Sequence, residues 1–338
     1  MIFVVLMRKK NKYILSICLA LSAFTSAIYS QPVPNVDENI PFLMVFGNKA
    51  GTSWGDDDYS QAFFFLVPKD FNQPVFIRVY DPDIGGDIDE LNGIWDSKST
   101  YSVYGGKGCW SDPDAQGNDP VGNYKSGTLL ATKTFGEEGR YDQNYYSFGP
   151  FNPGEGEYSE KFDKNVFKVI CEGTSGDDGN LFRYFLSSDP NSNKSVEGGN
   201  AFAYEYSFRM HNNPEEVSHI YPYVDDRTTL LHLANFDWDS DGIIRVVSVV
   251  RKGQMVPASG EDVWVRSETD SRAIFKINEP EKNTSMDVQF IKRKNPVVKN
   301  NNVVVYIRNQ YDQNIEFFTS PIGGVPKFKY SIGVKPAN

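Results

Sequence analysis

Short runs of alternating apolar and polar residues recur along this chain, separated by clusters of Gly, Asp, Asn and Pro. Such runs predict β-strands with one buried face. In the first part of the chain they lie at 42–46, 62–67, 75–80, 100–104, 129–134, 144–148, 166–171, 181–187 and 201–210. No segment keeps a helical period over a useful length, which favours antiparallel sandwiches over α/β folds.

The segment His211-Asn212-Asn213-Pro214 interrupts this pattern and predicts a domain boundary. A second set of strands is predicted at 218–224, 229–233, 243–251, 262–265, 273–277, 285–291, 303–307, 315–319 and 327–334. The predicted fold is therefore all-β, with two tandem antiparallel β-sandwich domains, jelly-roll/C2-like or Ig-like, at 41–212 and 213–338. The second has the size of an immunoglobulin domain but lacks the Cys…Trp…Cys pattern.

The first residues have the features of a targeting segment. A basic stretch from Arg8 to Lys12 precedes a short apolar core at 13–24, and small residues follow. This arrangement predicts a signal peptide at 1–30, a linker at 31–40, and export to the periplasm, the cell surface or the exterior. The apolar run is too short and interrupted for a stable membrane span.

Charge narrows the choice of partners. The chain carries a net charge of -10 with a pI near 4.9, which argues against nucleic acid because phosphate contacts need cations. Cations and neutral glycans remain compatible with such a surface. After cleavage of the signal only Cys109 and Cys171 remain, and the sequence leaves their pairing open.

The stretch 79–93, V-Y-D-P-D-I-G-G-D-I-D-E-L-N-G, brings Asp81, Asp83, Asp87 and Asp89 together in one loop after a strand. Carboxylates this close repel one another unless water or a cation separates them. Oxygen ligands from a flexible Asp/Gly loop suit calcium. A solvated acidic turn is the alternative.

The pattern V-x-D-x-D-x5-D at the end of a strand resembles the third calcium loop of C2 domains. The resemblance implies that Asp81, Asp83 and Asp89 are calcium ligands. The stretch 51–59, which includes Asp58, is similar to the first loop of that family. Too few residues separate the two stretches for the C2 topology, so the resemblance covers the loop alone.

If consecutive strands cross a sandwich from end to end, alternate connections emerge at the same end. The connections at 47–61, 81–99, 135–143 and 172–180 are then neighbours, and each contains acidic residues. Carboxylates from separate loops would complete a coordination shell that no single loop fills.

A second calcium loop is predicted at Asp237, Asp239 and Asp241. The run D-x-D-x-D-G matches the first half of an EF-hand loop, but the twelfth position is Ser248 and no helices flank it. A turn capped by its own aspartates is the other interpretation.

Catalytic signatures are scarce: the chain has three histidines and lacks the Gly-x-Ser-x-Gly, His-Glu-x-x-His and P-loop motifs. The sequence favours an exported binding or accessory protein with calcium-stabilised loops that recognises a glycan or an envelope protein. Trp54, Trp95 and Trp110 lie in predicted loops, where they would stack on sugar rings. The alternatives are a glycan hydrolase with paired carboxylates and a metal-free structural subunit of the envelope.

Overall fold

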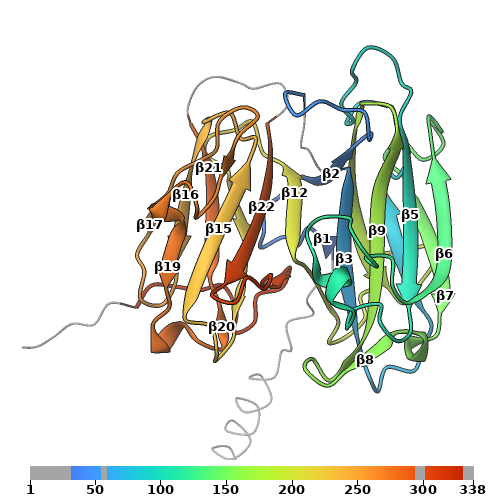
Figure 1. The fold of residues 1–338 in the computed structure, drawn as a ribbon. Helices are drawn as coiled ribbons and strands as arrows, with labels where there is room; N and C mark the ends of the chain where they lie inside the picture. Colours follow the sequence, from blue (N-terminus) through green and yellow to red (C-terminus); the bar gives the residue numbers. More distant parts are fainter. Residues whose placement is uncertain (1–31, 55–58, 294–300, 330–338) are drawn as a thin grey trace, which may run out of the picture.

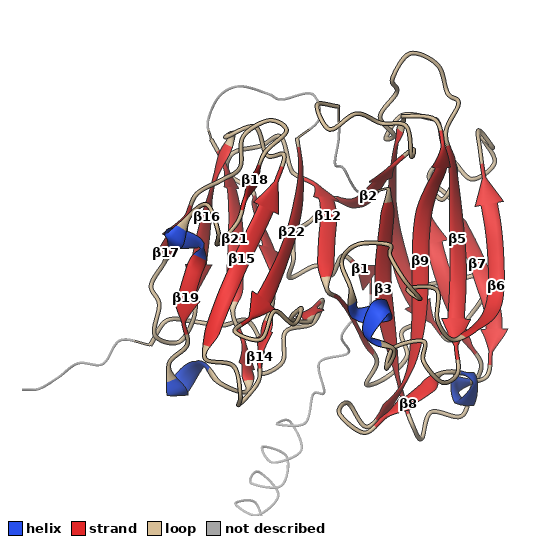
Figure 2. Cartoon of the chain, viewed as in Figure 1, coloured by secondary structure: helices blue, strands red, loops and turns tan. Residues whose placement is uncertain are grey.

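The structure, a computed structural model, describes residues 32–54, 59–293 and 301–329. The predicted signal peptide and Asp58 lie outside these residues. The all-β prediction is confirmed, because the described residues form antiparallel sheets without an α-helix. Their helical turns are the short 3-10 helices Pro113–Gln116, Pro153–Glu155, Ser271–Ala273 and Glu279–Glu281, drawn in blue in Figure 2.

The strands are numbered in chain order. They are β1 Pro32–Val33, β2 Phe42–Phe46, β3 Ser60–Pro68, β4 Val75–Tyr80, β5 Lys98–Gly105, β6 Thr128–Phe135, β7 Tyr145–Phe151, β8 Glu157–Ser159, β9 Lys164–Ser175, β10 Gly179–Ser187, β11 Asn200–Ala203, β12 Glu205–Arg209, β13 Val217–Ile220, β14 Tyr223–Val224, β15 Leu230–Phe236, β16 Gly242–Val247, β17 Gln254–Val256, β18 Trp264–Val265, β19 Ile274–Lys276, β20 Thr284–Ser285, β21 Asp287–Lys292, β22 Asn302–Asn309 and β23 Phe317–Phe318.

The N-terminal lobe, β1 to β11, packs two sheets face to face (Figure 1). One has the order β23-β11-β3-β9-β5-β6, and the other contains β2-β10-β4-β7. Alternation along β3 shows why they pack: Phe63 and Phe65 enter the main core, whereas Phe64 points to the opposite face. That face is also apolar because Phe202 of β11 and Phe318 of β23 cover it.

The C-terminal lobe, β13 to β22, is built in the same way. A sheet containing β18-β15-β22 faces a second sheet with the order β13-β21-β16-β17. Leu233 and Val305 from the first sheet and Val288 and Phe290 from the second belong to the same buried core.

Strand β12 connects the two lobes. It pairs with β2 through Phe208 and Leu43, and with β22 through Phe208 and Val303. A ten-stranded sheet therefore runs from one lobe into the other, and the main core is a single contiguous cluster. The expected boundary at 212/213 falls just after β12. The division into two domains stays a prediction, because sheet and core both cross that point.

Residues 32–40, expected as a linker, are packed into the fold. Strand β1 pairs with β10, and the Glu38 side chain is fully buried. Its carboxyl accepts hydrogen bonds from the Tyr206 hydroxyl at 2.6 Å and the Asn35 backbone N–H at 2.5 Å. Burial raises the pKa of Glu38 to about 8. The His219 N–H donates to the Glu38 carbonyl at 2.7 Å, so this segment contacts both lobes.

Candidate metal centre in the acidic loops

The four acidic connections of the N-terminal lobe meet at one end of the sandwich, as the alternation of loops predicts. The loop after β4 reaches the β6–β7 connection through the Ile84 N–H and the Gly136 carbonyl, 3.0 Å apart. It reaches the β9–β10 connection through the Asn92 N–H and the Asp178 carboxylate at 3.0 Å, and the start of β10 through paired 2.9 Å hydrogen bonds between Glu90 and Gly179. The β2–β3 connection joins them through the Gly47 N–H and the Asp178 carbonyl at 3.0 Å.

Three carboxylates converge at this end: Asp81, Asp83 and Asp142. Each offers one oxygen, and these oxygens lie within 4.8 Å of one another. Asp81 and Asp83 follow β4 directly and are only 2% and 1% exposed. Asp81 has a φ of 56°, in the left-handed region that aspartate tolerates better than most residues. This conformation ends the strand and starts the loop.

The two buried carboxylates are only half satisfied by hydrogen bonds. The Asp81 Oδ1 accepts from the Gln143 N–H at 2.7 Å, and the Asp83 Oδ2 accepts from the Glu138 N–H at 3.1 Å. The second oxygen of each, Asp81 Oδ2 and Asp83 Oδ1, is buried and has no hydrogen-bond partner among the described residues. Buried carboxylate oxygens are costly in this state, and a positively charged ligand could compensate them.

A third buried acceptor lies close by. The Asn180 side-chain amide donates to the Pro82 carbonyl at 3.3 Å and to the Tyr101 hydroxyl at 3.2 Å. Its Oδ1 is buried without a partner among the described residues. Neutral amide oxygens accompany carboxylates in many calcium sites.

Electrostatics at the cluster favours neutralisation of charge. Burial raises the pKa of Asp81 to about 7, and neighbouring Asp83 and Asp142 raise it as well. Burial also raises the pKa of Asp83 to about 6, with Asp142 as its main repulsive neighbour. A bound cation would replace the protons that these carboxyls otherwise retain near neutral pH.

The other two aspartates of the loop have different roles. Asp89 accepts backbone hydrogen bonds at both oxygens, from the Leu181 N–H at 2.8 Å and the Gly85 N–H at 2.9 Å. It anchors the loop to β10, although burial still raises its pKa well above the usual range. Asp87 is exposed. Of the three aspartates matched to the C2-type loop, Asp81 and Asp83 belong to the converging cluster, and Asp142 from another loop is its third member.

A second carboxylate cluster, Asp96, Asp177 and Asp178, lies at the same end of the lobe. The fully buried Asp178 carboxylate accepts three backbone hydrogen bonds, from Asn92 at 3.0 Å, Asp96 at 3.0 Å and Ser97 at 3.1 Å. Both of its oxygens already accept hydrogen bonds, so its role is to hold the loop before β5 in place.

The predicted loop at 237–241 does not gather its aspartates around one point. Among the described residues, Asp237, Asp239 and Asp241 are not part of a converging cluster. Asp237 accepts from the Asp262 N–H at 3.1 Å, and burial raises its pKa to about 7. Asp241 forms an ion pair of 2.6 Å with Lys292. The Lys292 ammonium thus pairs with the carboxylate that the EF-hand pattern would assign to calcium.

The three loop tryptophans do not share one platform. Trp54 packs beside Met44 and Phe46 at the edge of one hydrophobic cluster. Trp110 packs against other clusters, where its ring lies 5.1 Å from that of Phe162 and its indole N–H donates to the Tyr204 hydroxyl at 3.0 Å. Trp95 is half-buried beside the second carboxylate cluster.

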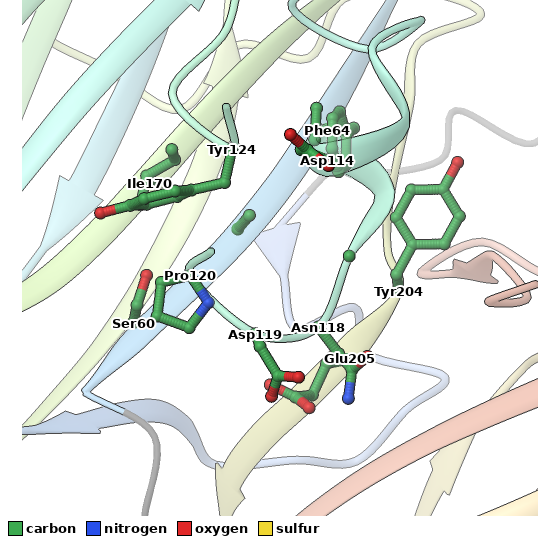
Figure 3. Close-up of a pocket in the computed structure, with 13 residues that line it drawn as sticks. Ser60, Phe64, Asp114, Asn118, Asp119, Pro120, Tyr124, Ile170, Tyr204 and Glu205 are labelled. Atoms are coloured by element: carbon green, nitrogen blue, oxygen red, sulfur yellow. The ribbon is translucent and has the colours of Figure 1, made fainter. Parts of the chain in front are cut away.

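Cavities lie on either side of the loop that carries Trp110 and on the neighbouring face of the C-terminal lobe. A small one of about 30 Å³ lies beneath that loop, and Figure 3 shows Tyr124 on one side of it and Asp119 and Glu205 on the other. Two larger cavities, of about 340 and 470 Å³, share Arg308 and Asp312. The larger lies between the loop and residues 308–314, where the Arg308 guanidinium donates to Asn118 at 2.8 Å, whereas the C-terminal lobe alone lines the other.

Comparison with family models, curated proteins and solved structures gave no match. The part of the chain that the structure describes contains no helix with the length and hydrophobicity needed to cross a membrane.

Proposed function

We propose that this is an exported binding or accessory protein whose N-terminal lobe holds a divalent cation, calcium by preference, at Asp81, Asp83 and Asp142. The observation that carries the proposal is the pair of buried oxygens, Asp81 Oδ2 and Asp83 Oδ1, without hydrogen-bond partners among the described residues. Both belong to residues whose oxygens converge with one from Asp142.

Calcium suits this site better than magnesium. The ligands come from two separate loops, and Ca²⁺ accepts irregular shells of six to eight oxygens, whereas Mg²⁺ requires a near-ideal octahedron. Protein groups supply part of such a shell and water the remainder. The cation would serve a structural role by joining the loop after β4 to the β6–β7 connection, so its binding free energy would add to the stability of the lobe.

The ordered loops would present a recognition surface for a glycan or an envelope protein. Support comes from the long connections gathered at one end of the lobe. A glycan array probed with the calcium-loaded protein tests this role. Binding without turnover supports recognition, whereas product formation would favour the hydrolase instead.

The metal is tested by thermal unfolding with calcium and with a chelator. Calcium at about 100 times its dissociation constant should stabilise the protein by roughly 2.7 kcal/mol. Asp83→Asn should remove most of the calcium-dependent shift because it replaces one charged ligand without changing its shape. Asp87→Asn, an exposed position in the same loop, is the matched control and should keep the shift. An identical midpoint with calcium and with chelator in the unmodified protein would exclude the site.

A further inference from the structure

Lys292 and Asp241 form a buried pair at the edge of the C-terminal lobe. Lys292 is the last residue of β21 and lies on the same face as Val288 and Phe290, which belong to the core. Asp241 directly precedes β16, and the residue after it, Gly242, is the Cα partner of Lys292 across the two strands. The Arg293 N–H donates to the Asp241 carbonyl at 2.8 Å, which fixes this register.

The two side chains are almost completely shielded from solvent. Lys292 Nζ lies 2.6 Å from Asp241 Oδ2, and the side chains are 2% and 4% exposed. Neither atom has a further hydrogen-bond partner among the described residues. Trp238, itself 1% exposed, packs so closely that a Cβ on Gly242 would lie 2.1 Å from its ring.

Another buried ion pair of this lobe has the additional hydrogen bonds that Lys292 and Asp241 lack. The Glu281 carboxylate, fully buried, accepts from Arg251 and from the Ser248 hydroxyl, and also from the backbone and side chain of Asn278. Such a network compensates for the loss of hydration. Lys292 and Asp241 lack one, so their opposite charges are only partly compensated. An amide in their place would carry no charge, so its burial would cost less free energy than the burial of two ions.

We propose that Lys292 and Asp241 condense into an intramolecular isopeptide bond. The Nζ–Cγ bond forms as a Cγ–O bond of Asp241 breaks, and the ammonium passes two protons to the departing oxygen, which leaves as water. The ion pair thereby becomes a neutral amide, without an oxidant or cofactor. Asp239, two residues before Asp241, interacts electrostatically with both members and would influence the charge state of the pair. It is a positioning residue for this step.

The bond would join the start of β16 to the end of β21. A cross-link of this kind restricts the unfolded chain and stabilises the folded lobe, as a disulfide does. It concerns the C-terminal lobe alone, so it does not rest on the proposed cation site in the other lobe.

Peptide mapping of the purified full chain tests the bond directly. Trypsin should release the peptide 228–245 covalently joined to 283–293, with cleavage blocked after Lys292 and a mass one water below the sum of the two. The unlinked peptides 228–245 and 283–292, recovered in full yield from folded protein, would overturn the proposal. Digestion of protein prepared with chelator should give the same branched peptide, which separates this result from the fate of the calcium site.

Three variants complete the test. Lys292→Arg keeps the ion pair but should give only unlinked peptides and a lower melting temperature. Asp241→Asn should still cross-link, with loss of ammonia in place of water. Asp239→Asn should retain the fold by circular dichroism yet accumulate the branched peptide more slowly. A branched peptide in Lys292→Arg, or equal cross-linking rates in Asp239→Asn and the unmodified protein, would contradict the mechanism.

Discussion

Glu90, in the acidic loop after β4, forms an ion pair with Arg209 at the end of β12. The two side chains are 7% and 17% exposed, and burial lowers the pKa of Arg209 to about 10. The loop end that would bind calcium is thus tied to the strand that both lobes share.

Replacing one partner should leave the other charge buried. Arg209→Met is expected to destabilise the protein by about 3 kcal/mol, because an unpaired buried carboxylate remains. Denaturant titration measures this loss. The control is Arg272→Met, which removes an exposed ion pair with Asp270 and should leave the stability close to that of the unmodified protein. Equal losses of unfolding free energy in the two variants would show that the Glu90–Arg209 pair stabilises the fold no more than an exposed pair does.

The acidic cluster should give the metal-free protein an unusual pH dependence. The folded-state pKa values of Asp81 and Asp83, about 7 and about 6, lie above the ordinary value near 3.8. Between pH 4 and 7 the folded state therefore binds more protons than the unfolded state does. The stability that these two carboxyls contribute is complete below about pH 4 and is lost as the pH rises through 7. The slope is up to about 1.4 kcal/mol per pH unit for each carboxyl.

Melting curves at several pH values, in chelator and in calcium, measure this effect. The stabilisation by calcium should grow over the same interval, because protons compete with the cation for the same oxygens. The double variant Asp81→Asn/Asp83→Asn should flatten the slope in chelator. A slope that the double variant leaves unchanged would assign the pH dependence to other groups.

Gly86 should be needed for the position of Asp142. Its φ is +71°, and a Cβ at this residue would lie 3.0 Å from the Asp142 carboxylate. Gly86→Ala should cost about 1 kcal/mol of stability through the left-handed backbone and should also weaken calcium binding. Gly93 has a φ of +86° with open space around it. Gly93→Ala should therefore lower stability through backbone strain but leave calcium binding unchanged. Calorimetric titration with calcium distinguishes the two variants.

Cys109 and Cys171 should behave as inert thiols in the folded protein. Both are buried and unbridged, and burial raises the pKa of Cys109 to about 12 and that of Cys171 well above its usual range. A thiol reagent should therefore react with neither residue until denaturant is added, when both should react. Rapid labelling of the native protein would contradict the buried positions.

The sequence predicted the β class and the meeting of the acidic loops because both depend on local features. Alternating runs mark strands such as β3, and loop order fixes which connections share an end of the sandwich. Which carboxylates converge was not accessible from the sequence. Asp89 and Asp142 look equally suitable in sequence, and only the backbone donors of Leu181 and Gly85 assign the first to an anchoring role.

Other features depended on long-range pairing, which leaves little trace in sequence. Glu38 appears in a polar stretch typical of a linker, yet Tyr206 and His219 hold it inside the fold. Likewise, Asp241 fits a calcium-loop pattern until Lys292, a distant residue on β21, is placed beside it. The strand that the sequence predicts at 262–265 is longer than β18, because the ends of this short strand depend on its pairing with β15.

The position of β12 has a consequence for how the chain can be divided. A fragment that stopped at residue 212 would carry β12 without β22 along one side, and β11 without β23. Both would become bare sheet edges with unpaired backbone groups, which recruit strands from other molecules. Expression of the N-terminal half alone should therefore give self-associating material, and a soluble minimal unit would need the strands contributed by the last part of the chain.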